Sequence, residues 1–146
     1  MKKNSTLLIS DIGIVTLQVH EAKNFNRVLH DPRRPETLLA TVSLGWSEPP
    51  IYKTTPSDSV DPPIWNSTSE FLCLDNASTT VVVKIMDGSG KNSTVYGHVS
   101  LPLGELLTAQ EDEQEWWPLS GCRDGQLRLS ADWKPIAMDR SSLYIK

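Results

Sequence analysis

A short polar loop between two apolar segments is the first place where this sequence could do chemistry. Residues 81–103 read VVVKIMDGSGKNSTVYGHVSLPL, with a Gly-Lys pair in the middle. Such pairs cradle phosphate in nucleotide-binding loops, which also need glycine five residues before Gly90 and serine or threonine after Lys91. The sequence has Ile85 and an asparagine at those places. The loop also leads into an expected strand instead of a helix N-terminus, so nucleotide binding is not expected.

The remaining nucleophiles and bases form no catalytic pattern. The sequence contains no Gly-x-Ser-x-Gly elbow, no Cys-x-x-Cys pair and no His-Glu-x-x-His motif. We predict that His20, His30 and His98 are solvated surface residues. Cys73 and Cys122 are expected to be reduced, with Cys73 in the core. The chain is therefore predicted not to be an enzyme.

Composition places the chain among ordinary globular domains. Its 146 residues suit one domain, and the formal net charge of -4 argues against nucleic acid as a partner. No apolar run approaches the roughly 18 residues that a membrane span needs. The apolar run near the start is too short for a secretory signal, so a cytoplasmic location is expected.

Alternating apolar and polar residues predict strands along most of the chain. Residues 14–20, IVTLQVH, place their apolar side chains on one face, as a half-buried strand does. Residues 56–66 are expected to form a proline-rich turn and residues 103–110 one or two helical turns. Further strands are predicted at 38–44, 51–55, 69–74, 80–86, 95–101, 116–119 and 126–133. This spacing is typical of an all-β, eight-stranded antiparallel β-sandwich.

Several phrases together resemble a C2 domain over residues 13–134. They are GIVTLQVHEAKNF, DPPIWNSTSEF, VVVKIMD followed ten residues later by glycine, and EWWPLSGCRDGQLRLSADWKPI. The last phrase is most similar to C2 modules of extended synaptotagmins and their fungal relatives, the tricalbins. The resemblance implies the type II strand order, because the chain opens on the strand that leads into the first tip loop. It also implies a domain at 13–136, a lead-in or linker at 1–12 and a tail or linker at 137–146.

The tryptophans differ in their expected burial. Trp65 and Trp133 fall at core positions of the resembled family. Trp116 and Trp117 are adjacent on an expected strand, so they should point to opposite faces. We expect Trp46 to be partly buried against the proline-rich loop.

The resemblance raises the question of calcium. Calcium-dependent C2 domains hold the ion between two tip loops with about five aspartates, because Ca²⁺ prefers six to eight hard oxygens. Asp87 matches the first position of the later loop, and the next positions fall on hydroxyl residues, Ser89 and then Ser93 or Thr94. In the earlier loop one position falls on Thr37, and Asp31 could serve only if that loop is shifted.

Asp31 and Asp87 are therefore interpreted as vestigial metal ligands. Hydroxyls bring no net charge against a divalent cation, so we expect no functional calcium site and no other cofactor. The expected role of Asp87 is to accept backbone hydrogen bonds within its own loop.

Basic residues occupy the same expected loops. Arg33, Arg34 and Lys91 would stand where calcium stands in the family, and arginine pairs with phosphate directly. The alternative is that all three are ordinary solubilising charges. Lys53 and Lys84, expected on neighbouring strands, form a second and weaker lipid-binding candidate.

Two functional hypotheses follow from the resemblance. The first is a non-catalytic C2 module of a larger membrane-tethering or lipid-transfer protein. It would bind anionic phospholipid membranes largely without calcium, as a peripheral protein at sites such as endoplasmic reticulum–plasma membrane contacts. The alternative is a calcium-independent module that binds a protein partner or packs on other domains of its own chain and binds no lipid.

Overall fold

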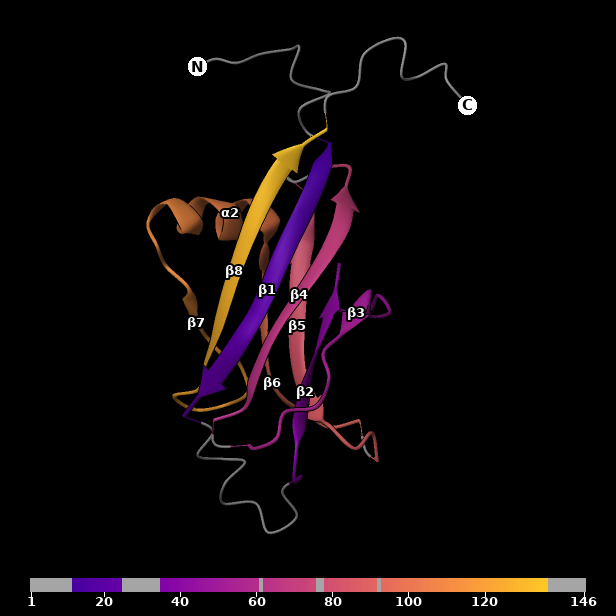
Figure 1. Cartoon of the computed structure of the whole chain (residues 1–146), viewed down its shortest axis with the longest axis vertical. Coiled ribbons are helices and arrows are strands. Elements are labelled where there is room, and N and C mark those ends of the chain that lie inside the picture. Colours follow the sequence, from indigo (N-terminus) through magenta and orange to yellow (C-terminus); the bar gives the residue numbers. More distant parts are fainter. Residues whose placement is uncertain (1–11, 25–34, 61, 76–77, 92, 137–146) are drawn as a thin grey trace.

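Two antiparallel sheets of four strands each pack face to face (Figure 1). The computed structural model describes residues 12–24, 35–60, 62–75, 78–91 and 93–136. One sheet has the order β4-β1-β8-β7, made of β4 (Ile64–Cys73), β1 (Gly13–Lys23), β8 (Gln126–Pro135) and β7 (Trp116–Pro118). The other has the order β3-β2-β5-β6, made of β3 (Tyr52–Lys53), β2 (Leu38–Ser43), β5 (Thr80–Asp87) and β6 (Val95–Pro102). Helix α2 (Leu103–Glu111) joins β6 to β7. The predicted eight-stranded β-sandwich is confirmed.

Strand β1 is the spine of the first sheet. It pairs with β4 on one side and with β8 on the other, both antiparallel. Val15, Leu17 and Val19 are at most 1% exposed, as the alternating sequence predicts. The register shifts between Val19 and Glu21 in both ladders, so His20 occupies a bulge.

Strand β4 begins earlier than predicted. The sequence indicates a turn as far as residue 66, but the strand starts at Ile64 and runs for 10 residues. The start of this strand was missed because its outer face is polar. Asn66, Thr68 and Glu70 lie on that face, while Trp65 and Cys73 face the core. The proline-rich segment ends at Pro63, whose carbonyl accepts a hydrogen bond from the Ala22 N–H at 3.1 Å.

The tryptophans follow the expected faces with one exception. Trp65 and Trp117 are buried and Trp116 is half-buried, so the adjacent pair points to opposite faces. Trp133, expected in the core, is only partly buried. It lies near the end of β8, where its ring covers Gly13 so closely that a Cβ there would lie 2.7 Å from Trp133 Cζ2.

The chain after β3 continues to pair with β2 through side chains as well as backbone. The Thr54 N–H donates to the Ala40 carbonyl at 2.9 Å, and the Ala40 N–H donates to Thr54 Oγ1 at 3.0 Å. Ser57 repeats this exchange with Leu38, at 2.8 Å through its N–H and 3.2 Å through its hydroxyl. Two buried hydroxyls therefore complete the edge of β2 where regular strand pairing stops.

Replacing Thr54 with valine tests this edge. Valine keeps the shape of threonine but leaves the buried Ala40 N–H without its acceptor. We expect the free energy of unfolding to fall by about 1–3 kcal/mol, measured by urea denaturation. Thr55→Val, the same change at the exposed neighbouring residue, is the matched control. An equal effect of both variants would contradict a structural role for the Thr54 hydroxyl.

Several connections meet at one end of the sandwich, which we call the loop pole. Its described residues are 24, 35–37, 54–60, 62–63, 88–91, 93–94 and 119–125. The pairs Lys23 with Gln126 and Leu38 with Asp87 are the strand ends that border it. At the opposite end Gly13 pairs with Pro135, so the first and last strands meet there (Figure 1). This is the expected type II order.

Candidate functional site at the loop pole

The turn after β5 is organised by its own aspartate. Asp87 is 7% exposed, and its Oδ1 accepts hydrogen bonds from the Ser89 N–H at 2.9 Å and the Ser89 hydroxyl at 2.8 Å. The Ser89 hydroxyl in turn accepts from the Lys91 N–H at 3.2 Å. This is an Asx-type turn, in which a side chain replaces a backbone partner. It holds the backbone of Lys91, whose side chain is exposed.

The structure brings this turn against Thr37, the residue of the earlier loop that falls at a metal-ligand position of the family. The Gly88 N–H donates to the Thr37 carbonyl at 2.9 Å. A Cβ at position 88 would overlap Thr37 Oγ1 and would lie 2.9 Å from Pro56 Cβ. Three connections of the loop pole therefore meet at Gly88, and only glycine fits there.

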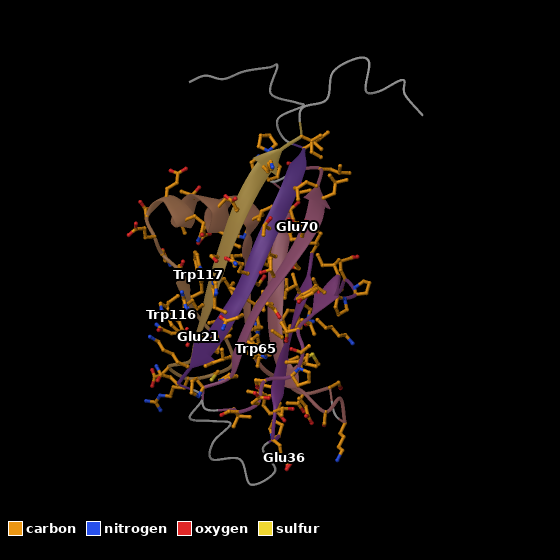
Figure 2. All side chains as sticks on the ribbon, viewed as in Figure 1. Glu21, Glu36, Trp65, Glu70, Trp116 and Trp117 are labelled. Atoms are coloured by element: carbon orange, nitrogen blue, oxygen red, sulfur yellow. The ribbon has the colours of Figure 1, made fainter. Side chains whose placement is uncertain are left out.

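The side chains described here do not fit a calcium ion. The Thr37 and Ser89 hydroxyls stand where carboxylates would be needed, and Asp87 already holds the turn. Glu36, exposed at the lower end of Figure 2, is the neighbouring carboxylate. Within the described residues no three His, Cys, Asp or Glu side chains cluster in a way that could hold a metal ion. Asp31 lies outside them, so the absence of calcium binding stays a prediction.

Among the five basic candidates, Arg33 and Arg34 also lie outside the described residues. Lys53 is exposed and Lys84 is half-buried. The prediction that these two lysines lie on neighbouring strands is wrong. Strand β2 separates β3 from β5, and both lysines pair across from Thr41. They therefore share a face of the sheet with one residue between them.

Lys84 is occupied by Trp46, the tryptophan of the connection after β2. Its Nζ donates to the Trp46 carbonyl at 3.0 Å and lies 3.9 Å from the centroid of the indole ring. The ring also meets His98 edge-on, with centroids 4.6 Å apart. Trp46 is 50% exposed and covers the outer face of its sheet, although the sequence predicted burial against the proline-rich loop. Lys84 and His98 supply the surface that the prediction missed.

A fourth connection lies at the loop pole, and this position was not predicted from the sequence. Residues 119–125 join β7 to β8 and carry exposed Arg123 and Asp124, while Lys23 ends β1 beside them. The predicted strands at 116–119 and 126–133 already left residues 120–125 as the connection between them. The glycines of SGCRDG signalled a turn, but the position of that turn at the loop pole depends on the strand order.

A polar network covers the outer face of the β1 sheet. Arg128 pairs with Glu115 and Glu21, each at 2.9 Å, and these hydrogen bonds raise its pKa. His20 Nε2 lies 2.7 Å from Ser130 Oγ, which donates to Gln18 Oε1 at 2.9 Å. Because the single hydroxyl hydrogen goes to Gln18, His20 is the donor to Ser130. A histidine that activates a serine must accept the hydroxyl hydrogen, so this arrangement does not form a base and nucleophile pair.

His20 and His98 are also less solvated than predicted, whereas His30 lies outside the described residues. His20 and His98 are half-buried, and desolvation lowers the pKa of each. The positive charge of Arg128 lowers the pKa of His20 further, and Lys84 does the same for His98. Glu115, Glu21 and a hydrogen bond with Asn66 raise the pKa of His20 in opposition to these effects.

Stability is expected to fall as the pH drops below the ordinary histidine pKa of 6.5. A histidine with a lowered folded pKa binds fewer protons in the folded than in the unfolded protein. Between these two pKa values, the free energy of unfolding therefore rises with pH. Urea denaturation at about pH 7.5 and at about pH 5.5 measures this change in the free energy of unfolding. The two values lie about one pH unit above and below the ordinary histidine pKa. The double variant H20Q/H98Q should lose less stability over this interval. An equal loss in both proteins would contradict the assignment.

Known proteins share this sequence pattern. Residues 13–119 match the C2 domain family. Mouse extended synaptotagmin-1 is 27% identical over 125 residues, covering 84% of this chain and 10% of that protein. Synaptotagmin-4 of Arabidopsis thaliana is 25% identical over 138 residues, covering 92% of this chain and 24% of that protein. The chain thus spans about a tenth to a quarter of the length of the curated relatives it matches.

Solved structures agree on the fold. A single C2 domain of plant extended synaptotagmin 1 superposes with a TM-score of 0.66 and 22% identity, covering 86% of this chain and 97% of that one. A calcium-bound pair of C2 domains from extended synaptotagmin 2 gives a TM-score of 0.67 and 17% identity, covering 90% and 45%. No helix in the described part of the chain is both long enough and apolar enough to cross a membrane. With a family match over most of its length and this strand order, the chain belongs to the C2 domain family.

Proposed function

We propose that residues 13–136 form a non-catalytic C2 module of a larger membrane-tethering or lipid-transfer protein. The module binds anionic phospholipid membranes through its loop pole, largely without calcium. The turn at 87–91 carries this proposal. Asp87 accepts hydrogen bonds within the turn and is therefore not free to act as a metal ligand. The exposed Lys91 supplies a fixed positive charge in the loop that matches a calcium-binding loop of the family.

The charge at the loop pole sets the strength of binding. Each basic residue near an anionic leaflet contributes about 1 kcal/mol, so Arg33, Arg34 and Lys91 together give only weak attachment. Weak attachment is useful when other domains of the same chain bind the same membranes, because linked sites gain avidity. The relatives in which this module fills a small part of a longer chain support that arrangement.

The second candidate patch contributes less in this proposal. Lys84 is engaged by Trp46, whereas Lys53 is exposed on the same face. The patch therefore serves as a secondary contact when the module lies flat. We propose a cytoplasmic location at membranes, including contacts between the endoplasmic reticulum and the plasma membrane.

Co-sedimentation with liposomes tests the proposal. Vesicles with and without phosphatidylserine and a phosphoinositide are compared in calcium and in chelator. We expect binding in chelator, and a loss of at least about 100-fold when Arg33, Arg34 and Lys91 are all changed to glutamate, because each change removes a positive charge and adds a negative one. Lys91→Glu and Lys134→Glu form a matched pair, because both lysines are exposed and lie at opposite ends of the sandwich. Only Lys91→Glu should weaken binding.

Two results would contradict the proposal. Binding that requires calcium would show that Asp31 and Asp87 take part in a working metal site. Absence of binding under every condition would favour the alternative, a module that packs on a protein or on its own chain. Leu72 and Leu74 give that alternative a structural basis, since they are 52% and 67% exposed on or beside the edge strand β4.

A further inference from the structure

A polar pocket of about 750 Å³ opens at the loop pole, outside the residues considered so far for lipid binding. Lys23 and Asn24 line it from the end of β1, Asp124 lines it from the turn before β8, and Gln126 lines it from the first position of β8. The pocket therefore combines one cationic side chain, one anionic side chain and two amides. Chain segments a hundred residues apart in sequence build it.

The strand register fixes the floor of the pocket. Gln126 pairs with Lys23 on one side and with Pro118 on the other, so the three side chains share one face of the sheet. The turn forms the wall. The Leu119 N–H donates to the Gly125 carbonyl at 2.9 Å, and a Cβ at position 125 would lie only 2.7 Å from Cys122 Sγ. Both floor and wall are thus held by backbone pairing and close packing.

The charges of the pocket are not cancelled by their neighbours. The Lys23 ammonium lies 4.0 Å from the centroid of the Trp116 ring. Glu21 and Glu115, the nearby acids, are both paired with Arg128. Asp124 forms no ion pair with any residue that the structure describes. Lys23 also forms no ion pair within the described residues and, unlike Lys84, donates no hydrogen bond to the carbonyl of the tryptophan beneath it, so a cation and an anion face one open pocket.

We propose that this pocket binds a phosphate ester that also carries an ammonium group, as the headgroups of phosphatidylserine and phosphatidylethanolamine do. Lys23 and the amide groups of Asn24 and Gln126 hold the phosphate, and Asp124 accepts hydrogen bonds from the ammonium. Asp124 disfavours ligands that carry only negative charge, such as inositol phosphates or glycerol phosphate. The proposal rests on the proposed function, because the loop pole must reach the membrane surface for a lipid headgroup to enter.

Two vesicle types of equal charge isolate the role of Asp124. Phosphatidylserine and phosphatidylglycerol each carry one net negative charge, and they are mixed with phosphatidylcholine at the same mole fraction. We expect the wild-type protein to bind phosphatidylserine vesicles about fivefold more tightly, the worth of one exposed ion pair. Asp124→Asn should abolish this preference. Lys23→Gln should weaken binding to both vesicles by a similar factor.

The variants are chosen to preserve the fold. Asp124 has a left-handed backbone with φ 62°, a conformation that asparagine also tolerates. Asp132→Asn makes the same charge change at an exposed position on β8, away from the pocket, and should leave the preference for phosphatidylserine intact. Thermal unfolding of all three variants checks that they fold as the wild type does.

A soluble probe separates a lipid headgroup from a free phosphate ester. O-phosphoserine is titrated into ¹⁵N-labelled protein, and shifts of the Asn24, Asp124 and Gln126 amides that are lost in Asp124→Asn support the pocket. Such shifts without vesicle binding would keep the pocket, assign it to free phosphate esters and overturn the proposed membrane function. Equal wild-type binding of the two vesicle types, with no effect of Asp124→Asn and no amide shifts, would overturn the pocket and leave membrane binding standing.

Discussion

Replacing Trp65 with alanine is expected to lower the free energy of unfolding by about 3–5 kcal/mol. The indole is 8% exposed at the start of β4, and its Nε1 donates to the Leu38 carbonyl on β2 at 2.9 Å. This side chain therefore joins the two sheets by packing and by a buried hydrogen bond. Figure 2 labels Trp65 in the lower half of the sandwich. Urea denaturation followed by circular dichroism measures the loss.

Two further variants separate the causes. Trp65→Phe keeps most of the ring and removes only the Nε1–H donor. The Leu38 carbonyl keeps its hydrogen bond from the Ser57 N–H, so we expect a smaller loss of about 0.5–1.5 kcal/mol. Trp46→Ala removes a tryptophan that is 50% exposed and should cost less than Trp65→Ala. If Trp46→Ala were as damaging as Trp65→Ala, the packing described for Trp65 would not explain its effect.

Gly88→Ala is the second large expected effect, with a loss of about 1–3 kcal/mol from overpacking. The added methyl group would press on Thr37 and Pro56, so the connections before β2 and before β4 would have to move away from the turn after β5. Gly90→Ala is the control. Its Cβ would meet no atom within 4 Å, although its φ of 74° adds backbone strain of its own.

The two glycine variants should therefore differ in what they disturb. Amide spectra should change around Thr37 and the neighbours of Pro56 in Gly88→Ala, whereas in Gly90→Ala changes should stay within the turn. Under the proposed function, membrane binding through the loop pole should weaken in Gly88→Ala because the turn that carries Lys91 would move. A Gly88→Ala protein with wild-type stability would show that the three connections are not packed as the structure has them.

The sequence predicted the sandwich because most strands alternate and carry β-branched residues, as β1 and β5 do. It failed at the start of β4, where the half-buried strand is too polar on its outer face to be distinguished from a loop. The sequence also predicted that Asp87 accepts backbone hydrogen bonds within its own loop, and Ser89, two residues later, donates them. Local chemistry of this kind is readable from sequence.

Contacts between segments that are distant in the sequence could not be predicted from it. The contact of Lys84 with Trp46 spans 38 residues and depends on how the connection after β2 folds back over the sheet. The pocket between Lys23 and Asp124 requires the strand order and the register of three strands at once. Alternation predicts which face a side chain occupies, but not which strand lies beside it.

The pairing of the first strand with the last determines how the module would respond to mechanical load. Gly13 lies opposite Pro135, and the Ile136 N–H donates to the Ile12 carbonyl at 3.0 Å, so the two ends of the domain are antiparallel neighbours. Tension applied through both ends would load the β1–β8 ladder in the unzipping geometry, in which its hydrogen bonds break one after another. Shear, in which many bonds resist together, would not arise. A module pulled between two membranes in this way would yield at low force, beginning at the end farthest from the loop pole.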